Sequence, residues 1–281
     1  MSYLDDLSRE LSVRGIRGRL RRRILAETDD HLRSDPAAQQ RFGTPSEVAN
    51  AFAAELGAHA SRRAAVGAFA TLGVAGGVYG AAFVSLAFTG SPSETLKPTL
   101  GALALAVIVF APQVSFVAGT LALTRVLRRR DRVLPTQELV VIRRRIGFGL
   151  AFGLATMGAL ALYAYEFGPA LAGWWTTFAF ASTSGASVLL VAAAVPAARA
   201  ARLRPRIAGG AGDVFDDLGV QRLRGAPWRF ACGVALGVGL AVWLAGIVQA
   251  DPIGGLIRGV LEGLACLGGF AVLGRYLGLR R

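Results

Sequence analysis

The stretch IGGLIRGVLEGLACLGGFAVL, residues 253–273, decides the fold class because it is long and apolar enough to cross a lipid bilayer. A bilayer core takes about 20 mostly apolar residues. Five further runs resemble it, so the predicted spans are 64–88, 100–123, 146–163, 175–198, 228–248 and 253–273. We therefore expect an all-α polytopic membrane protein with six transmembrane helices.

The distribution of basic residues predicts the orientation of these spans. The chain carries a net charge of +13, and Lys97 is its one lysine, so the other 30 of its 31 basic residues are arginines. Nearly all arginines lie in segments 1–63, 125–145, 199–229 and 275–281, whereas the alternate connections contain only Lys97. Short basic segments stay on the cytoplasmic side. We expect a bacterial inner (plasma) membrane protein with both termini in the cytoplasm and no direct binding of nucleic acid.

Residues 1–63 are polar enough to form a separate cytoplasmic helical domain, followed by a transmembrane domain over 64–281. The segments YLDDLSREL and RGRLRRRILAETDDHLRS predict two helices, with the turn between them marked by the glycines of RGIRG. A third helix begins with Thr44 as N-cap, Pro45 in the first position and Glu47 closing a capping box.

These helices carry a family resemblance. The segments YLDDLSREL, RRRILAETDDHLRS and RFGTPSEVANAFAAEL, within residues 3–58, resemble the HAAS-type signalling domain, a module similar to the permease prefix. The remainder, with DVFDDLG, PWRF and GRYLGLR, is similar to multi-pass membrane proteins of actinobacteria that carry this prefix. The resemblance implies a non-catalytic regulatory role and association with a PadR-type transcriptional regulator.

The sixth span holds two opposite charges, Arg258 and Glu262, one helical turn apart near its middle. Intramembrane charges are costly, by at least about 2.5 kcal/mol each on insertion scales, and are enriched at functional sites. Two interpretations stay open: an ion pair that fixes helix packing, or a pair that responds to a ligand, an ion or a proton.

Glycines at intervals of four predict close helix contacts in several spans, because such spacing lets two backbones approach. The candidate packing positions are Gly255, Gly259 and Gly263 in the sixth span, Gly233 and Gly237 in the fifth, and Gly73 and Gly77 in the first. On the cytoplasmic side, Arg17, Arg21 and Arg22 with Asp216 and Asp217 form a candidate partner surface; the alternative for the basic helix is a position on anionic lipid.

Catalysis finds no support in the sequence. The two histidines, His31 and His59, belong to no metal-binding spacing, and we expect no catalytic residue, no metal and no cofactor. We expect a regulatory or signalling membrane protein that relays the state of the membrane to a cytoplasmic partner. The alternative is a permease or a membrane subunit of a transport complex, with homo-oligomers or other membrane subunits as further possible partners beside the lipid bilayer.

Overall fold

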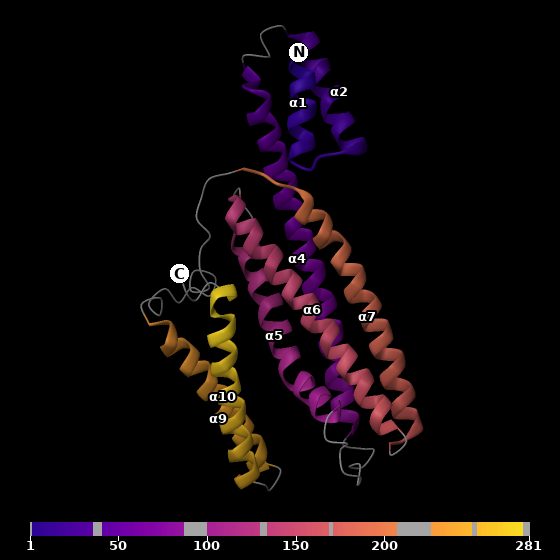
Figure 1. Cartoon of the computed structure of the whole chain (residues 1–281), viewed down its shortest axis with the longest axis vertical. Helices are drawn as coiled ribbons and strands as arrows, with labels where there is room; N and C mark the ends of the chain where they lie inside the picture. The colour runs from indigo at the N-terminus through magenta and orange to yellow at the C-terminus, as the bar shows by residue number, and fades with distance from the viewer. Residues whose placement is uncertain are drawn as a thin grey trace. The chain divides into compact units, whose positions relative to one another are not determined.

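The computed structural model describes residues 2–35, 41–86, 100–129, 134–168, 171–206, 226–248 and 252–277. Within these ranges it contains eight α-helices and no β-strand (Figure 1). The helices are α1 (Tyr3–Val13), α2 (Gly18–Ser34), α4 (Pro45–Leu86), α5 (Leu100–Arg128), α6 (Thr136–Phe167), α7 (Gly173–Arg202), α9 (Pro227–Val248) and α10 (Pro252–Leu277). The chain divides into two compact units, residues 1–211 and 212–281.

Six of these helices, α4, α5, α6, α7, α9 and α10, are long and apolar enough to cross a membrane. Each contains a long, mostly apolar stretch with few charged side chains. The expected all-α fold with six candidate membrane helices is therefore confirmed, and the chain is a multi-pass membrane protein in contact with the bilayer.

The N-terminal end of the first unit is a small helical layer formed by α1, α2 and the start of α4. Its core contains Leu7, Leu11 and Ile24, all at most 4% exposed, packed against Ala49 and Ala53 of α4. Apolar residues on one face of each short helix are buried together because water is excluded from the contact. We call this group of helices, residues 2–56, the prefix.

The start of α4 has the capping box that the sequence predicts. The Thr44 backbone amide donates to Glu47 Oε2 at 2.8 Å, and the Glu47 amide donates to Thr44 Oγ1 at 3.3 Å. Gly43 precedes this cap with φ +78°, a conformation in which glycine pays no steric cost. Two backbone donors of the first helical turn are thereby satisfied.

Helix α4 then runs without interruption for 42 residues, from the prefix into the first membrane span. The expected boundary at residues 63 and 64 is therefore not a break in the chain's structure, and the prefix belongs to the same compact unit as four of the spans. The sequence GAHASRR at 57–63 explains this continuity, because it contains no proline and only one glycine.

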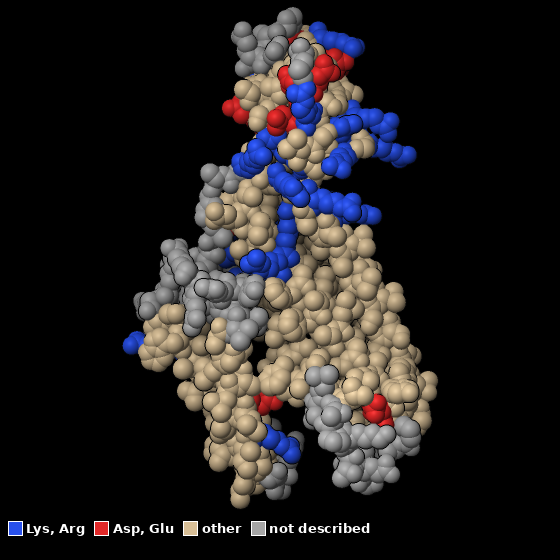
Figure 2. Space-filling view, viewed as in Figure 1, with Lys and Arg blue, Asp and Glu red and all other residues tan. Residues whose placement is uncertain are grey.

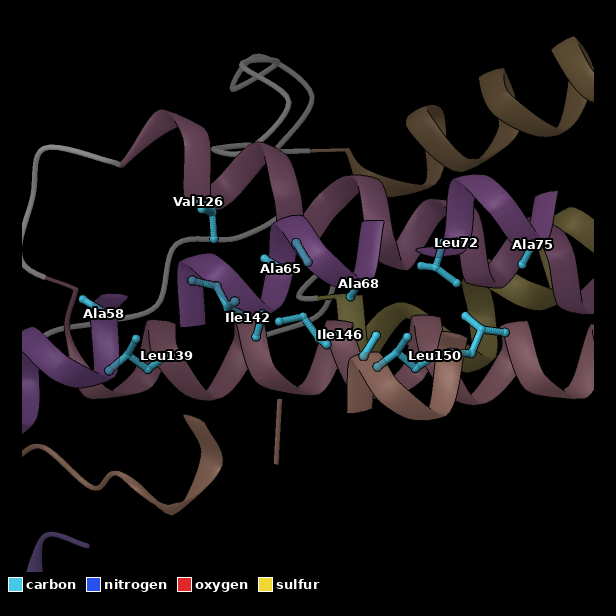
Figure 3. Close-up of a cluster of buried hydrophobic side chains, with 14 of the residues drawn as sticks. Ala58, Ala65, Ala68, Leu72, Ala75, Val126, Leu139, Ile142, Ile146 and Leu150 are labelled. Atoms are coloured by element: carbon cyan, nitrogen blue, oxygen red, sulfur yellow. The ribbon is translucent and has the colours of Figure 1, made fainter. Parts of the chain in front are cut away.

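The four membrane helices of the first unit enclose an extended apolar core (Figure 3). Leu139, Ile142, Ile146 and Leu150 form a buried stripe along α6 that faces small residues and Leu72 of α4. Positions three and four apart share one helix face, so a stripe of this spacing buries that face continuously. Helix α5 packs on α6, and α7 packs on α4 and α6.

Two further details of this bundle concern Pro112 and Trp175. Helix α5 is continuous through Pro112 and Gln113. Trp175 is fully buried, and its Nε1 donates to Ser85 Oγ at 2.9 Å. A buried indole needs such a partner, which α4 supplies.

Candidate functional site

The main point of connection in the first unit is the segment Leu203–Arg206, which follows α7 and lies against the prefix; we call it the junction segment. The Arg204 amide donates to the carbonyl oxygen of Arg14, at the end of α1, at 3.0 Å. Asn50 of α4 binds Arg206 twice: its Oδ1 accepts from the Arg206 amide at 2.6 Å and its Nδ2 donates to the Arg206 carbonyl at 3.1 Å. Three backbone-directed bonds thus join the end of a membrane helix to the prefix.

Gly15 permits the closest part of this contact. It has φ +83°, and a Cβ atom built on it would overlap the Arg202 carbonyl oxygen and lie 3.6 Å from Leu203 Cα. The neighbouring turn glycine, Gly18, has φ +65° but would place its Cβ in open space. Gly15 is therefore required for two reasons, backbone conformation and close approach, whereas Gly18 is required only for the first.

Side chains on both sides hold the junction segment in place. Leu203 packs against the apolar core of the prefix. Thr136 Oγ1 of α6 donates to the Pro205 carbonyl at 2.8 Å, and Arg143 Nη1 donates to the Leu203 carbonyl at 2.9 Å. The four residues of this segment therefore contact the prefix and the first turns of α6 at the same time, which couples the two mechanically.

A layer of buried arginines lies beside the junction segment. Arg125 and Arg145 are 0% and 2% exposed, and Arg145 Nη1 donates to the Leu121 carbonyl at 3.1 Å. Glu138, only 1% exposed, forms an ion pair with Arg129. In Figure 2 the basic side chains of the first unit gather over this region and the adjoining prefix. Breaking a buried pair leaves an uncompensated charge, so these contacts fix the helix ends.

Sequence analysis did not find the junction segment or this layer. The arginines of segment 125–145 were interpreted only as markers of orientation, and the tetrad LRPR at 203–206 carries no motif. The signals that were present are Pro205, which ends the preceding helix, and the glycines of RGIRG. Neither indicates that two segments almost 190 residues apart in sequence would touch, because such a contact is a property of the tertiary fold.

The structure describes the three arginines of the predicted partner surface but not its two aspartates. Arg17 and Arg22 are exposed on the start of α2, and Arg21 is half-buried with its Nη1 donating to Ser12 Oγ at 2.6 Å. Asp216 and Asp217 lie outside the described residues. The exposed arginines are accessible to a partner or to anionic lipid, while Arg21 also holds α2 to α1.

The predicted charge pair and glycine ridge lie in α10, which forms a helical hairpin with α9 in the second unit. A Cβ on Gly255 would lie 2.7 Å from Gly246 Cα, and one on Gly263 would lie 3.2 Å from the Ala235 carbonyl oxygen. Gly259 and Gly239 approach each other backbone to backbone. These glycines therefore lie at the tightest part of the hairpin.

The two charged residues of α10 do not pair with each other among the described contacts. Arg258 is exposed and Glu262 is half-buried, and no nitrogen–oxygen distance of 4.0 Å or less joins them. An ion pair between them is one of the two interpretations of the sequence, and this conformation does not contain it.

The remaining predicted packing glycines have different surroundings. A Cβ built on Gly73, Gly77, Gly233 or Gly237 would meet no described atom within 4 Å. In the first unit, close approach occurs instead at Gly119, Gly149 and Gly153, where a Cβ would come within 2.7 to 3.1 Å of the Leu72 side chain. Spacing alone does not tell which face of a helix is packed.

Chemistry that requires clustered ligands has no counterpart in the described part of the chain. No group of three histidine, cysteine, aspartate or glutamate side chains is placed to hold a metal ion among those residues.

A cavity of about 110 Å³ between α4, α5 and α6 is lined by Leu72, Pro112, Ser115, Thr156 and other residues. It is smaller than pockets that hold small-molecule ligands, which measure about 300–1,000 Å³.

Comparison with protein family models, with curated proteins and with solved structures finds no match to this chain.

Proposed function

We propose that this protein is a membrane-embedded regulatory component that relays the state of the bilayer to a cytoplasmic partner. The observation that carries the proposal is the junction segment, which binds the prefix and α6 through four residues. A displacement of α6 or α7 relative to α4 strains these bonds and changes the position of the prefix. Such a contact between a membrane helix and a polar domain is suited to transmitting a conformational change, because packed elements move as units.

The orientation and the partner complete the proposal. Placing the arginine-rich helix ends in the cytoplasm, as the positive-inside rule favours, puts the prefix and both termini on that side of a bacterial inner membrane. The exposed Arg17 and Arg22 then face the cytoplasm. The resemblance of the prefix to HAAS-type signalling domains supports a PadR-type transcriptional regulator as the partner, with no direct contact between this chain and DNA and no enzymatic step.

A matched pair of glycine variants tests this proposal. Gly15→Ala introduces a Cβ where the Arg202 carbonyl lies, whereas Gly18→Ala imposes a similar positive-φ strain with open space around it. Full-length wild-type and variant proteins are crosslinked in native membranes, and the captured partners are identified by mass spectrometry. A DNA-binding regulator so identified is then purified and its binding to each protein in nanodiscs is measured.

We expect a DNA-binding regulator to be captured, and we expect Gly15→Ala to change its affinity at least several-fold while Gly18→Ala does not. Hydrogen exchange of residues 203–206 reports whether the junction opened. Equal affinities for the two variants, with the junction open only in Gly15→Ala, would contradict the coupling. Capture of an ATPase or transport subunits in every case would favour the transport alternative.

A further inference from the structure

The turn between α1 and α2 concentrates arginines that no carboxylate neutralises. Residues 11–25 contain six arginines and no aspartate or glutamate. Three of the six bond to side chains of α1 or α2 and are therefore already engaged. The other three are Arg17, Arg19 and Arg22. All three are exposed, and none has a nitrogen within 4.0 Å of a carboxylate oxygen among the described contacts.

The junction segment holds this turn at the level of the lipid headgroups. The predicted span in α7 ends at residue 198, and Arg202 lies four residues beyond it, a rise of about 6 Å. The polar layer on each side of a bilayer core is about 5–7 Å thick. Gly15 packs against the Arg202 carbonyl, and the Arg14 carbonyl accepts from the Arg204 amide at 3.0 Å. Arginine side chains of the turn are therefore within reach of lipid phosphates.

The exposed surface of the turn also carries apolar side chains. Val13, at the end of α1, is 55% exposed, and Leu20, in the first turn of α2, is 42% exposed. Apolar side chains next to arginines are typical of segments that lie in the headgroup layer of a membrane. In Figure 2 the basic side chains of the prefix gather at the end that adjoins the membrane helices, and most of its acidic side chains lie farther away. The charge of this end is complementary to an anionic membrane surface.

We propose that the α1–α2 turn binds the anionic phospholipids of the membrane in which the chain is embedded. Arg17, Arg19 and Arg22 bind lipid phosphates, and Val13 and Leu20 lie among the headgroups. A protein partner would have to displace lipid to reach these arginines, because the turn lies at headgroup depth. This contact goes beyond the proposed signalling role and does not depend on the binding of a regulator.

A fluorescence experiment on the full-length protein tests the contact. In a Cys232→Ala, Cys266→Ala background, a bimane label is attached at Leu20→Cys or, as a matched control, at His31→Cys, an exposed position about 16 Å farther along α2. Each protein is placed in nanodiscs of phosphatidylcholine, or of phosphatidylcholine mixed with phosphatidylglycerol. Both lipid mixtures contain the same fraction of a lipid with a nitroxide quencher on its headgroup. Fluorescence lifetimes give the ratio of quenched to unquenched label.

We expect the Leu20→Cys label to be quenched more strongly in the nanodiscs that contain phosphatidylglycerol, and the His31→Cys label to be quenched little in both. Each arginine near an anionic surface strengthens binding about fivefold, so Arg22→Gln should lower the ratio at Leu20→Cys about fivefold, and glutamine at all three exposed arginines about 100-fold. The comparison of lipid mixtures uses the native arginines and therefore does not depend on how these variants fold.

Arg33→Gln is the charge control, because it removes an exposed arginine from the far end of α2 and should leave the ratio unchanged. Equal quenching in the two lipid mixtures, or no response to Arg22→Gln and the triple variant, would overturn the proposal. Quenching that inorganic phosphate abolishes at constant ionic strength would show a site for a free anion and would also overturn it.

A Leu20→Cys label that stays unquenched in both mixtures and is shielded by a cytoplasmic regulator would assign the arginines to that protein. This result would refute the lipid contact and leave the proposed signalling role intact. Strong quenching without any captured regulator would support the lipid contact and count against the signalling role.

Discussion

In the α9–α10 hairpin, helix packing alone decides whether a glycine-to-alanine substitution raises or lowers the free energy of unfolding. Replacing a helical glycine with alanine favours the helix by up to about 1 kcal/mol. At Gly259 the added Cβ would overlap the Gly239 carbonyl oxygen and lie 3.4 Å from the Trp243 backbone nitrogen. Backbone atoms cannot rotate away, so the two helices have to separate. Overpacking of this kind costs about 1–3 kcal/mol.

Gly233→Ala is the matched control, because Gly233 lies in α9 with no described atom within 4 Å of the added Cβ. We expect Gly259→Ala to be less stable than Gly233→Ala by about 1–3 kcal/mol, the propensity term being common to both. Hydrogen exchange of α9 and α10 in bicelles, followed as SDS is added, gives the free energy of unfolding of the hairpin. Equal values for the two variants would refute the backbone contact.

Three further predictions concern the first unit and its prefix. Glu138→Gln leaves Arg129, whose side chain is 28% exposed, without its carboxylate and should lower the free energy of unfolding by about 1.5–3 kcal/mol, measured by SDS titration; an effect below about 1 kcal/mol would mean that the pair is hydrated. Trp175→Phe removes the indole donor to α4 and should cost about 0.6–1.7 kcal/mol in the same titration; a neutral result would show that the bond contributes nothing. Hydrogen bonds from the hydroxyl and the backbone amide of Ser2 hold the pKa of Asp5 below its usual value. The stabilisation by this cap is therefore complete above the usual aspartate pKa and is lost as the pH falls through the lowered pKa of the folded state. Ser2→Ala should return the pKa of Asp5 toward its usual value in an NMR titration, and an unchanged pKa would exclude the cap as the cause.

Local sequence signals predicted the elements of this fold well. The six apolar runs match six membrane helices, and the Thr44–Glu47 box begins its helix as expected. These features depend on residues within a few positions of each other, so their formation can be predicted from a single segment of sequence. Hydrogen bonding in α7 is local too, since Thr183 donates to the Ala179 carbonyl of its own helix.

The features that sequence did not predict all depend on distant partners. Trp175 is buried because α4 happens to offer Ser85 and a carbonyl beside it. Gly73 and Gly149 stand in equally glycine-rich spans, but only Gly149 faces a neighbouring helix closely. The junction segment has no motif because its bonds are made by backbone groups, which every residue carries.

The unbroken helix α4 acts as a lever. Its 42 residues correspond to a rod of about 63 Å, longer than the roughly 30 Å hydrocarbon core. When the helix tilts about a point within the bilayer, its end outside the bilayer is displaced. A tilt of about 5° moves a point 30 Å from the pivot by almost 3 Å, about half a helical pitch. Bilayers of different thickness impose different tilts. Under the proposed function, a change in membrane thickness then displaces the capped end of α4, at a distance that the lipid itself does not reach.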